Sequence, residues 1–131
     1  MARREGASGS SQNVNLCVKR AYAPATRADG YRVLVDRLWP RGLAKAAAAM
    51  DEWPRELAPS TALRRWFAHD PARWAEFQRR YAHELDARPE LVAALVSRVR
   101  RQPVTLLFGA RDELHNNAVA LREYLRARHG L

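Results

Sequence analysis

The chain has 131 residues, which fits one domain of ordinary size, and hydrophobic residues make up 47% of it, enough for a core. Its apolar runs are far shorter than the roughly 18 residues that cross a bilayer, and its start, "MARREGASGSSQN", lacks the apolar stretch of a signal peptide, so we expect a cytoplasmic protein without a membrane partner. The formal charge of +9, from 23 basic and 14 acidic residues, favours anionic partners, although an arginine-rich composition is also what GC-rich coding produces.

The first half of the chain predicts two strands after a tail. Residues 1–13 are expected to be a disordered tail because they are rich in Gly, Ser and Ala. "VNLCVKR" (14–20) alternates apolar and polar residues and predicts a strand. "YRVLVDRL" (31–38) contains a continuous apolar run that suits a strand covered on both faces. The alanine-rich residues 43–50 predict a helix or a variable loop, and "DEWPREL" (51–57) a short strand or a turn.

The following region is helical in pattern. Ser60 is expected to cap a short helix, and Asp70 followed by Pro71 marks the start of another. Pro89 opens a further helix. One helix face is marked by apolar residues that recur at spacings of three and four, namely Trp74, Phe77, Tyr81 and Leu85.

The end of the chain predicts one more strand and one more helix. "PVTLLFG" (103–109) is the clearest strand, and the final helix is marked by Leu114, Ala118, Leu121 and Leu125. A strand that helices separate from its neighbours in sequence is normally parallel to them. We therefore predict a single α/β domain over residues 14–131, with a mostly parallel sheet and several helices.

Charged side chains follow the predicted strands at their carboxyl ends, where ligands bind in an open parallel sheet. The first strand ends at Lys19 and Arg20, the second runs into "DRLWPRG" (36–42), and the last is followed by "RDELHNN" (111–117). The free N–H groups of a helix start attract anions, and arginine matches phosphate and carboxylate geometry. We predict that these tips meet at one rim and form an anion site from Lys19, Arg20, Arg37, Arg41 and Asn116.

His115 is the candidate general acid or base at this rim, since the ordinary pKa of histidine lies near 6.5. Asp36 or Asp112 would orient it. Structural roles compete with each of these roles. Asp112 is also a candidate helix N-cap, His115 a half-buried structural histidine, and the two asparagines that follow it capping residues. Arg37 and Arg41 are equally well explained as solvated loop residues or as ion-pair partners of nearby aspartates.

Other reactive residue types are given structural interpretations. Cys17 lies inside the first predicted strand and is expected in the core; as a lone cysteine it cannot form an internal disulfide. His69, with His115 and Asp112, matches no established metal-ligand spacing, so neither a metal nor a cofactor is predicted. The aromatic residues between 66 and 81 are expected to fill the core.

Several long blocks resemble one known family. "KRAY" (19–22), "DGYRVLVDRLWPRG" (29–42), "ELAPST" (56–61), "VTLLFGARD" (104–112) and "HNNAVALREYL" (115–125) are similar to the YeaO-like branch of domain-of-unknown-function family 488. The resemblance covers residues 16–126 and implies a three-layer flavodoxin-like or Rossmann-like fold, with no settled activity. It adds Trp39, Ser60 and His69 to the motif positions. The longer branch of the family carries a Cys-His-Arg segment where this chain has "LHNN" (114–117), which argues against a thiol mechanism there.

Two functions follow from these observations. The first is a small-molecule site, in a binding protein or an enzyme, for a phosphate- or nucleotide-like anion at the strand rim. The alternative is a nucleic-acid-associated or regulatory module that uses arginines on the helix surfaces, namely Arg64, Arg65, Arg79, Arg80, Arg98, Arg100 and Arg101. The two differ in where the positive charge gathers, in a concave pocket or along a convex face.

Overall fold

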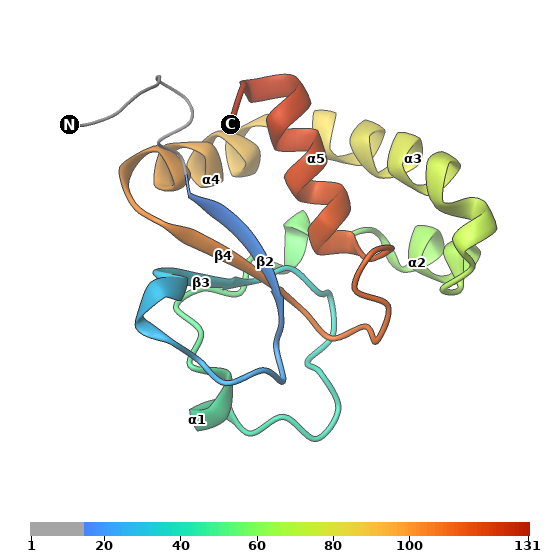
Figure 1. Cartoon of the computed structure of the whole chain (residues 1–131). Coiled ribbons are helices and arrows are strands. Elements are labelled where there is room, and N and C mark those ends of the chain that lie inside the picture. Colours follow the sequence, from blue (N-terminus) through green and yellow to red (C-terminus); the bar gives the residue numbers. More distant parts are fainter. Residues whose placement is uncertain (1–14) are drawn as a thin grey trace.

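The computed structural model describes residues 15–131, and a small parallel sheet lies at its centre (Figure 1). Strands β2 (Leu16–Arg20), β4 (Val104–Phe108) and β3 (Tyr31–Leu34) are hydrogen-bonded in that order, and both pairings are parallel. The prediction of an α/β chain with a parallel sheet is confirmed. The predicted tail at residues 1–13 lies outside the described residues.

Five α-helices follow the expected segments within residues 15–131: α1 (Lys45–Ala48), α2 (Thr61–Phe67), α3 (Trp74–Asp86), α4 (Pro89–Arg101) and α5 (Asn117–His129). Short 3₁₀ turns occupy Arg27–Asp29, Arg55–Leu57 and Pro71–Arg73. The predicted caps are confirmed, because the Ser60 hydroxyl accepts the N–H of Leu63 and Asp70 accepts the N–H of Ala72. None of the helices in residues 15–131 combines the length and the apolar character that a membrane span requires.

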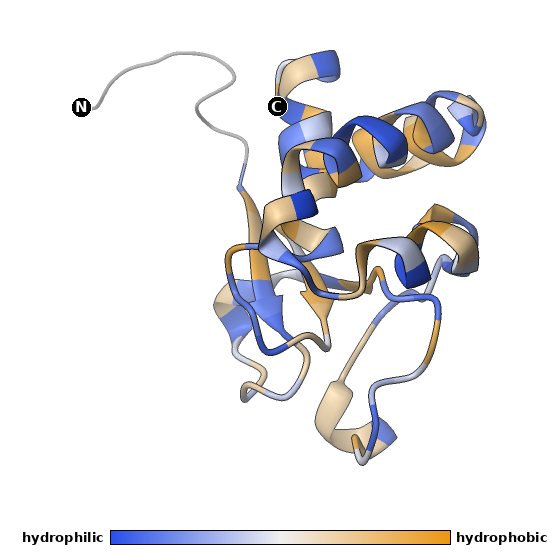
Figure 2. Cartoon of the chain, turned by 90° about the vertical axis from the view of Figure 1, so that its right-hand side faces the viewer, coloured by the Kyte–Doolittle hydropathy of each residue, from blue (hydrophilic) through white to orange (hydrophobic). Residues whose placement is uncertain are grey.

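The long helices α3, α4 and α5 lie together over one face of the sheet (Figure 1). The main core forms there, where alternate strand residues such as Val33, Leu106 and Phe108 pack with Tyr81 and Leu121. Figure 2 shows hydrophobic and hydrophilic residues alternating along these helices, as expected for helices with one buried side. This core confirms the predicted role of the aromatic residues Phe67, Phe77 and Tyr81.

A loop rather than a layer of long helices covers the other face. Leu34 and Leu107 are register neighbours that point to this side and pack with Trp39 and Trp53 from the segment that contains the one-turn helix α1. The three-layer flavodoxin-like arrangement is therefore not confirmed. Residues 51–57 contribute a single parallel bridge, Val33 to Glu52, and a 3₁₀ turn, in line with the prediction of a short strand or turn.

Two sequence predictions about single residues are wrong. Cys17 is exposed, because it alternates on the edge strand β2 with Leu16 of the main core and so points to the loop-covered face, at the sheet edge where its side chain stays open to solvent. Leu114 is also exposed, because α5 begins only at Asn117 and the preceding residues form a loop. Strand β3 ends at Leu34 rather than at residue 38, although the N–H of Val35 still donates to the carbonyl of Leu107.

A buried ion cluster lies on the loop-covered face. The carboxylate of Asp29 accepts hydrogen bonds from Lys19 Nζ at 3.0 Å, from both polar groups of Thr26, and from the guanidinium of Arg32. Arg32 is 3% exposed and also donates to the carbonyls of Ala48 and Ala49. The cluster joins the turn before β3 to strand β2 and to the end of α1.

Acid is expected to weaken the fold through this cluster. Burial acts to raise the pKa of Asp29, but the hydrogen bonds from Thr26, Lys19 and Arg32 outweigh it and lower that pKa from 3.8 to about 2. The ionised carboxylate therefore contributes about 2 kcal/mol above pH 4, and this contribution disappears as the pH falls from about 4 to about 2. Between pH 5 and pH 2, the free energy of unfolding in urea should fall less for Asp29→Asn than for the unchanged protein. Equal decreases in the two proteins would contradict the assignment of this acid sensitivity to Asp29.

Candidate functional site at the strand ends

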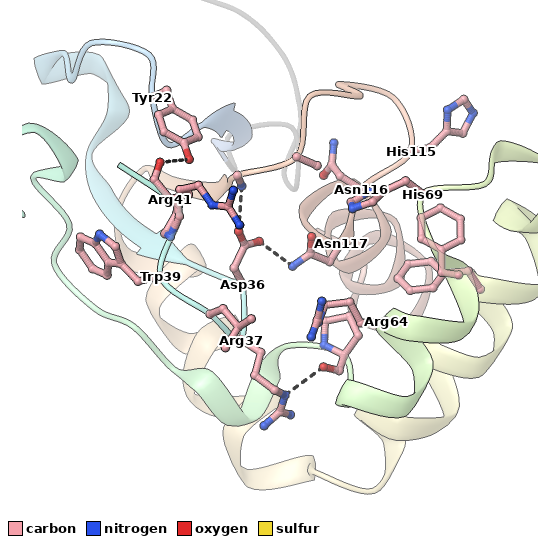
Figure 3. Close-up of a pocket in the computed structure, with 17 residues that line it drawn as sticks. Tyr22, Asp36, Arg37, Trp39, Arg41, Arg64, His69, His115, Asn116 and Asn117 are labelled. Carbon is pink, nitrogen blue, oxygen red and sulfur yellow. Dashed lines mark hydrogen bonds between the residues drawn. The ribbon is translucent and has the colours of Figure 1, made fainter. Parts of the chain in front are cut away.

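A cavity of about 430 Å³ opens at the carboxyl ends of β3 and β4, between the start of α5 and the end of α2 (Figure 3). Apolar side chains, among them Phe67 and Phe77, form part of its wall. Its polar lining gathers residues that are far apart in the sequence: Tyr22, Asp36, Arg37, Arg41, Arg64, His69, His115, Asn116 and Asn117. The tips of two of the three strands thus converge on one hollow.

Asp36 is the carboxylate in this lining and joins three elements. Its Oδ2 accepts the N–H of Gly109 after β4 at 2.9 Å, and its Oδ1 accepts the amide of Asn117 at the start of α5 at 3.0 Å. A Cβ atom at position 109 would lie 2.9 Å from Oδ2, so glycine permits this approach. Asn117 also donates to the carbonyl of Val35 at 2.6 Å. The end of β3 is therefore tied to β4 and α5 at the cavity.

The charge of Asp36 is disfavoured by its surroundings. Burial raises the pKa of this carboxyl group, while the hydrogen bonds from Asn117 and Gly109 and the positive charges of Arg64 and His69 act to lower it. Among residues 15–131, Asp36 has no ion-pair partner within 4.0 Å. It is thus a half-buried acceptor beside cationic groups that do not contact it.

Three cationic or titratable side chains line the cavity without a partner inside the described part of the chain. The guanidiniums of Arg41 and Arg64 and the imidazole of His69 have neither a hydrogen bond nor an ion pair within residues 15–131. Tyr22 donates to the backbone carbonyl of Arg41 at 2.6 Å and holds that loop. His69 follows Ala68, and both adopt left-handed backbone conformations with φ of 56° and 49°, which turn the chain sharply at the end of α2.

Arg37 lies at the same hollow, but its guanidinium is engaged. It donates to the carbonyls of Pro59 and Ala58 at 3.1 and 3.3 Å, and it lies 3.9 Å from Glu56. These contacts attach the chain after β3 to the segment before α2. Arg37 therefore forms part of the cavity wall, and its charge is partly balanced by Glu56.

His115 and Asp112 form a pair at the far side of the cavity. Nδ1 of His115 donates to Oδ2 of Asp112 at 2.9 Å, and the ring packs edge-on against Trp74 with centroids 5.3 Å apart. The N–H of Leu114, the His115 ring and the His115 N–H lower the pKa of Asp112. In Figure 3 the His115 ring points away from Asp36. Of the two predicted orienting carboxylates, Asp112 is thus the one that contacts His115.

Three other predicted site residues have their polar atoms engaged. Asn116 is 2% exposed; it caps α5 by accepting the N–H of Val119 and donates to the carbonyl of Asp112. It is this cap, rather than Asp112, that begins the helix; Asp112 instead caps the turn at residues 114 and 115. Ser60 pairs with Glu84, and Trp39 donates to the carbonyl of Leu43 at 2.6 Å.

The first strand does not bring its two basic residues to the cavity. Lys19 pairs with Asp29 on the loop-covered face, because a strand residue points to the opposite face from its neighbour. Arg20 donates to the carbonyls of Ala110 and Gly109 and stacks on Tyr22, 4.9 Å from its ring centroid. Tyr22, which follows the first strand, therefore lines the cavity. Arg20 contacts the carbonyls of two lining residues, Gly109 and Ala110.

Three polar residues of the cavity lining were not among the predicted site residues. Asn117 was available as the second asparagine of the pair, and its contact with Asp36 becomes evident once β3 and α5 are adjacent. Arg64 carries no local signal, since it is one arginine among several on a helix. Tyr22 belongs to the "KRAY" block and is signalled only by that block. Within residues 15–131, no group of three His, Cys, Asp or Glu side chains is arranged to hold a metal ion.

The comparisons with known proteins identify the family. The family described as "Inactive DUF488-N3 subclade" matches residues 15–130. "Uncharacterized protein YeaO" of Escherichia coli (strain K12) is 42% identical over 114 residues, which are 87% of this chain and 99% of that protein. "Uncharacterized protein Rv3073c" of Mycobacterium tuberculosis is 38% identical over 111 residues, 85% of this chain and 93% of that protein. No solved structure matches the chain. The chain therefore belongs to the YeaO-like proteins of family 488, in the subclade described as inactive.

Proposed function

We propose that the cavity at the strand ends binds a small phosphate- or nucleotide-like anion. The observation that carries the proposal is that Arg41, Arg64 and His69 line one concave site and have no partner for their side chains within residues 15–131. Guanidinium groups bind phosphate and carboxylate through paired N–H donors. A volume of about 430 Å³ lies in the range of small-molecule sites.

The chemistry of the lining favours binding over catalysis. Within residues 15–131 it contains no cysteine, serine, threonine or lysine, so its possible nucleophiles are Asp36, Tyr22 and the two histidines. The family description as inactive agrees with a binding role. A general acid or base role for His115, oriented by Asp112, stays a prediction. A variant of His115 that binds anions with unchanged affinity would be consistent with the binding role.

The nucleic-acid alternative depends on the arginines of the helix surfaces. Several of these are engaged within residues 15–131: Arg79 and Arg80 pair with Glu76, and Arg98 lies over the ring of Tyr31. Arg64 belongs to the cavity. This distribution favours the small-ligand role. A DNA duplex should accordingly bind weakly, and steeply salt-dependent binding of high affinity would instead favour the alternative.

Removal of the guanidinium of Arg41 or of Arg64 should abolish most of the anion affinity. We expect that millimolar phosphate or adenosine monophosphate raises the melting temperature of the protein, because a ligand that binds the native state stabilises it. In Arg41→Ala and in Arg64→Ala, the affinity measured by calorimetry should fall by about tenfold to a hundredfold, the usual effect of losing a charge-assisted hydrogen bond.

Arg65→Ala is the matched control, because Arg65 is the exposed neighbour of Arg64 on α2 and lies outside the cavity lining. It loses the same charge and should leave the affinity unchanged. Equal losses in the Arg64 and Arg65 variants would indicate a general effect of net charge. Absence of any anion-induced stabilisation would contradict the proposed function.

A further inference from the structure

Asp36 is an unusual residue for an anion site, because its carboxylate faces the same cavity as the free guanidiniums. A carboxylate has about four acceptor positions. Within residues 15–131, Asp36 uses two of them, one for the N–H of Gly109 and one for the amide of Asn117. Because the side chain lines the cavity, its remaining acceptor positions can be offered to a ligand there.

A simple anion would be repelled by this carboxylate, since like charges in a partly buried site interact strongly. The repulsion is offset when the ligand also donates a hydrogen bond from one of its own groups to the carboxylate oxygen. A hydroxyl or amino group is such a donor, and its hydrogen bond to an ionised acceptor is stronger than one between neutral groups. A ligand that contacts both the arginines and Asp36 therefore needs an anionic group for the arginines and a hydrogen-bond donor for Asp36.

We propose that Asp36 determines the specificity of the site by accepting a hydrogen bond from a hydroxyl or amino group of the bound anion. The ligand class is then an organic phosphate or carboxylate that carries a donor near its anionic group, such as a phosphorylated polyol or amino alcohol. This inference rests on the proposed function, because it assumes that Arg41 and Arg64 bind the anionic group.

Two phosphate esters of similar size and equal charge, which differ in their hydroxyl groups, test the effect of the donor alone. Glycerol 3-phosphate carries two hydroxyl groups on its carbon chain, whereas n-propyl phosphate has the same three-carbon chain and none. At about pH 8 both phosphate groups are dianions, since their second pKa is about 6, and neither then supplies a P–OH donor. The unchanged protein should bind glycerol 3-phosphate about tenfold more tightly, which corresponds to one hydrogen bond to a charged acceptor. Phosphoethanolamine, with an amino donor, should also bind more tightly than n-propyl phosphate.

Asp36→Asn should change the two affinities in opposite directions. The single carbonyl oxygen of asparagine can keep the N–H of Gly109, whereas its amide group cannot accept from Asn117. Because the negative charge is also lost, n-propyl phosphate and inorganic phosphate should bind more tightly and glycerol 3-phosphate less tightly. A merely structural role of Asp36 would weaken all of these ligands together. Asp70→Asn is the control, because it removes an aspartate charge outside the lining while asparagine keeps the cap on residues 71–73.

The outcomes distinguish this inference from the proposed function. If the unchanged protein binds glycerol 3-phosphate and n-propyl phosphate equally, the inference is overturned, while the anion site stands. This comparison decides the question even where the Asp36 variant fails to fold. If none of the phosphate esters and no inorganic phosphate binds, both the anion site and the role of Asp36 are overturned.

Discussion

Replacing Arg32 by alanine is expected to lower the free energy of unfolding by about 3 kcal/mol, the lower end of the range for breaking a buried ion pair, because Asp29 keeps Lys19 as a second partner. Arg32 is almost fully buried and donates to the Asp29 carboxylate and to the carbonyls of Ala48 and Ala49. The alanine variant leaves these acceptors without the guanidinium in a site that water reaches poorly. Equilibrium unfolding in urea at pH 7 measures the loss.

Arg79→Ala provides the comparison for this variant. Arg79 is also an arginine paired with an acid three residues away, but its side chain is exposed and its partner Glu76 is on the helix surface. The exposed pair should contribute less than about 1 kcal/mol. Similar losses in the two variants would show that the Asp29–Arg32 cluster does not hold the loop-covered face together.

Gly30→Ala is expected to cost roughly 3 kcal/mol, from backbone strain and a steric overlap acting together. Gly30 has a φ of +65°, and a Cβ atom there would lie 2.3 Å from the carbonyl oxygen of Pro103. That oxygen accepts the N–H of Tyr31 at 2.9 Å, the contact that aligns the start of β3 with β4. The overlap therefore displaces the strand pairing itself, and urea unfolding should detect it.

Gly42→Ala separates the two causes, because Gly42 has a similar φ of +75° but no atom within 4 Å of an added Cβ. Only the left-handed backbone then opposes alanine, which costs about 1 kcal/mol. A Gly30 variant as mild as the Gly42 variant would mean that β3 and β4 tolerate a shift at this point.

The central parts of the strands and the starts of several helices could be predicted, because they depend on local sequence patterns. The continuous apolar run over residues 33–35 and the strand at 104–108 follow from hydrophobicity, and the caps at Ser60 and Asp70 follow from residue type. The exposure of Cys17 was not predictable in the same way. It depends on β2 being an edge strand and on which of its faces the loop covers, and both are properties of the assembled sheet.

The candidate site was predictable as a location but not as a set of contacts. Following the rule that ligands bind beyond strand ends, the sequence pointed to Arg41 and the start of α5, and these do line one cavity. The rule does not say which face of a strand a residue occupies, so the predicted site included Lys19. The alternation of side chains along β2 directs Lys19 to Asp29 instead. The rule also missed Arg64, because α2 is held at the cavity by the packing of Leu63 and Phe67 into the main core, which a local pattern does not reveal.

The attachment of Asp36 to Gly109 and Asn117 has a consequence for affinity. Ordering a loop at the moment of binding consumes part of the interaction free energy. In the proposed site, the acceptor offered to a ligand is already fixed by hydrogen bonds from two other elements. Asp36 is therefore preorganised, and the entropy lost in the proposed binding would be confined to the ligand and to the arginine side chains.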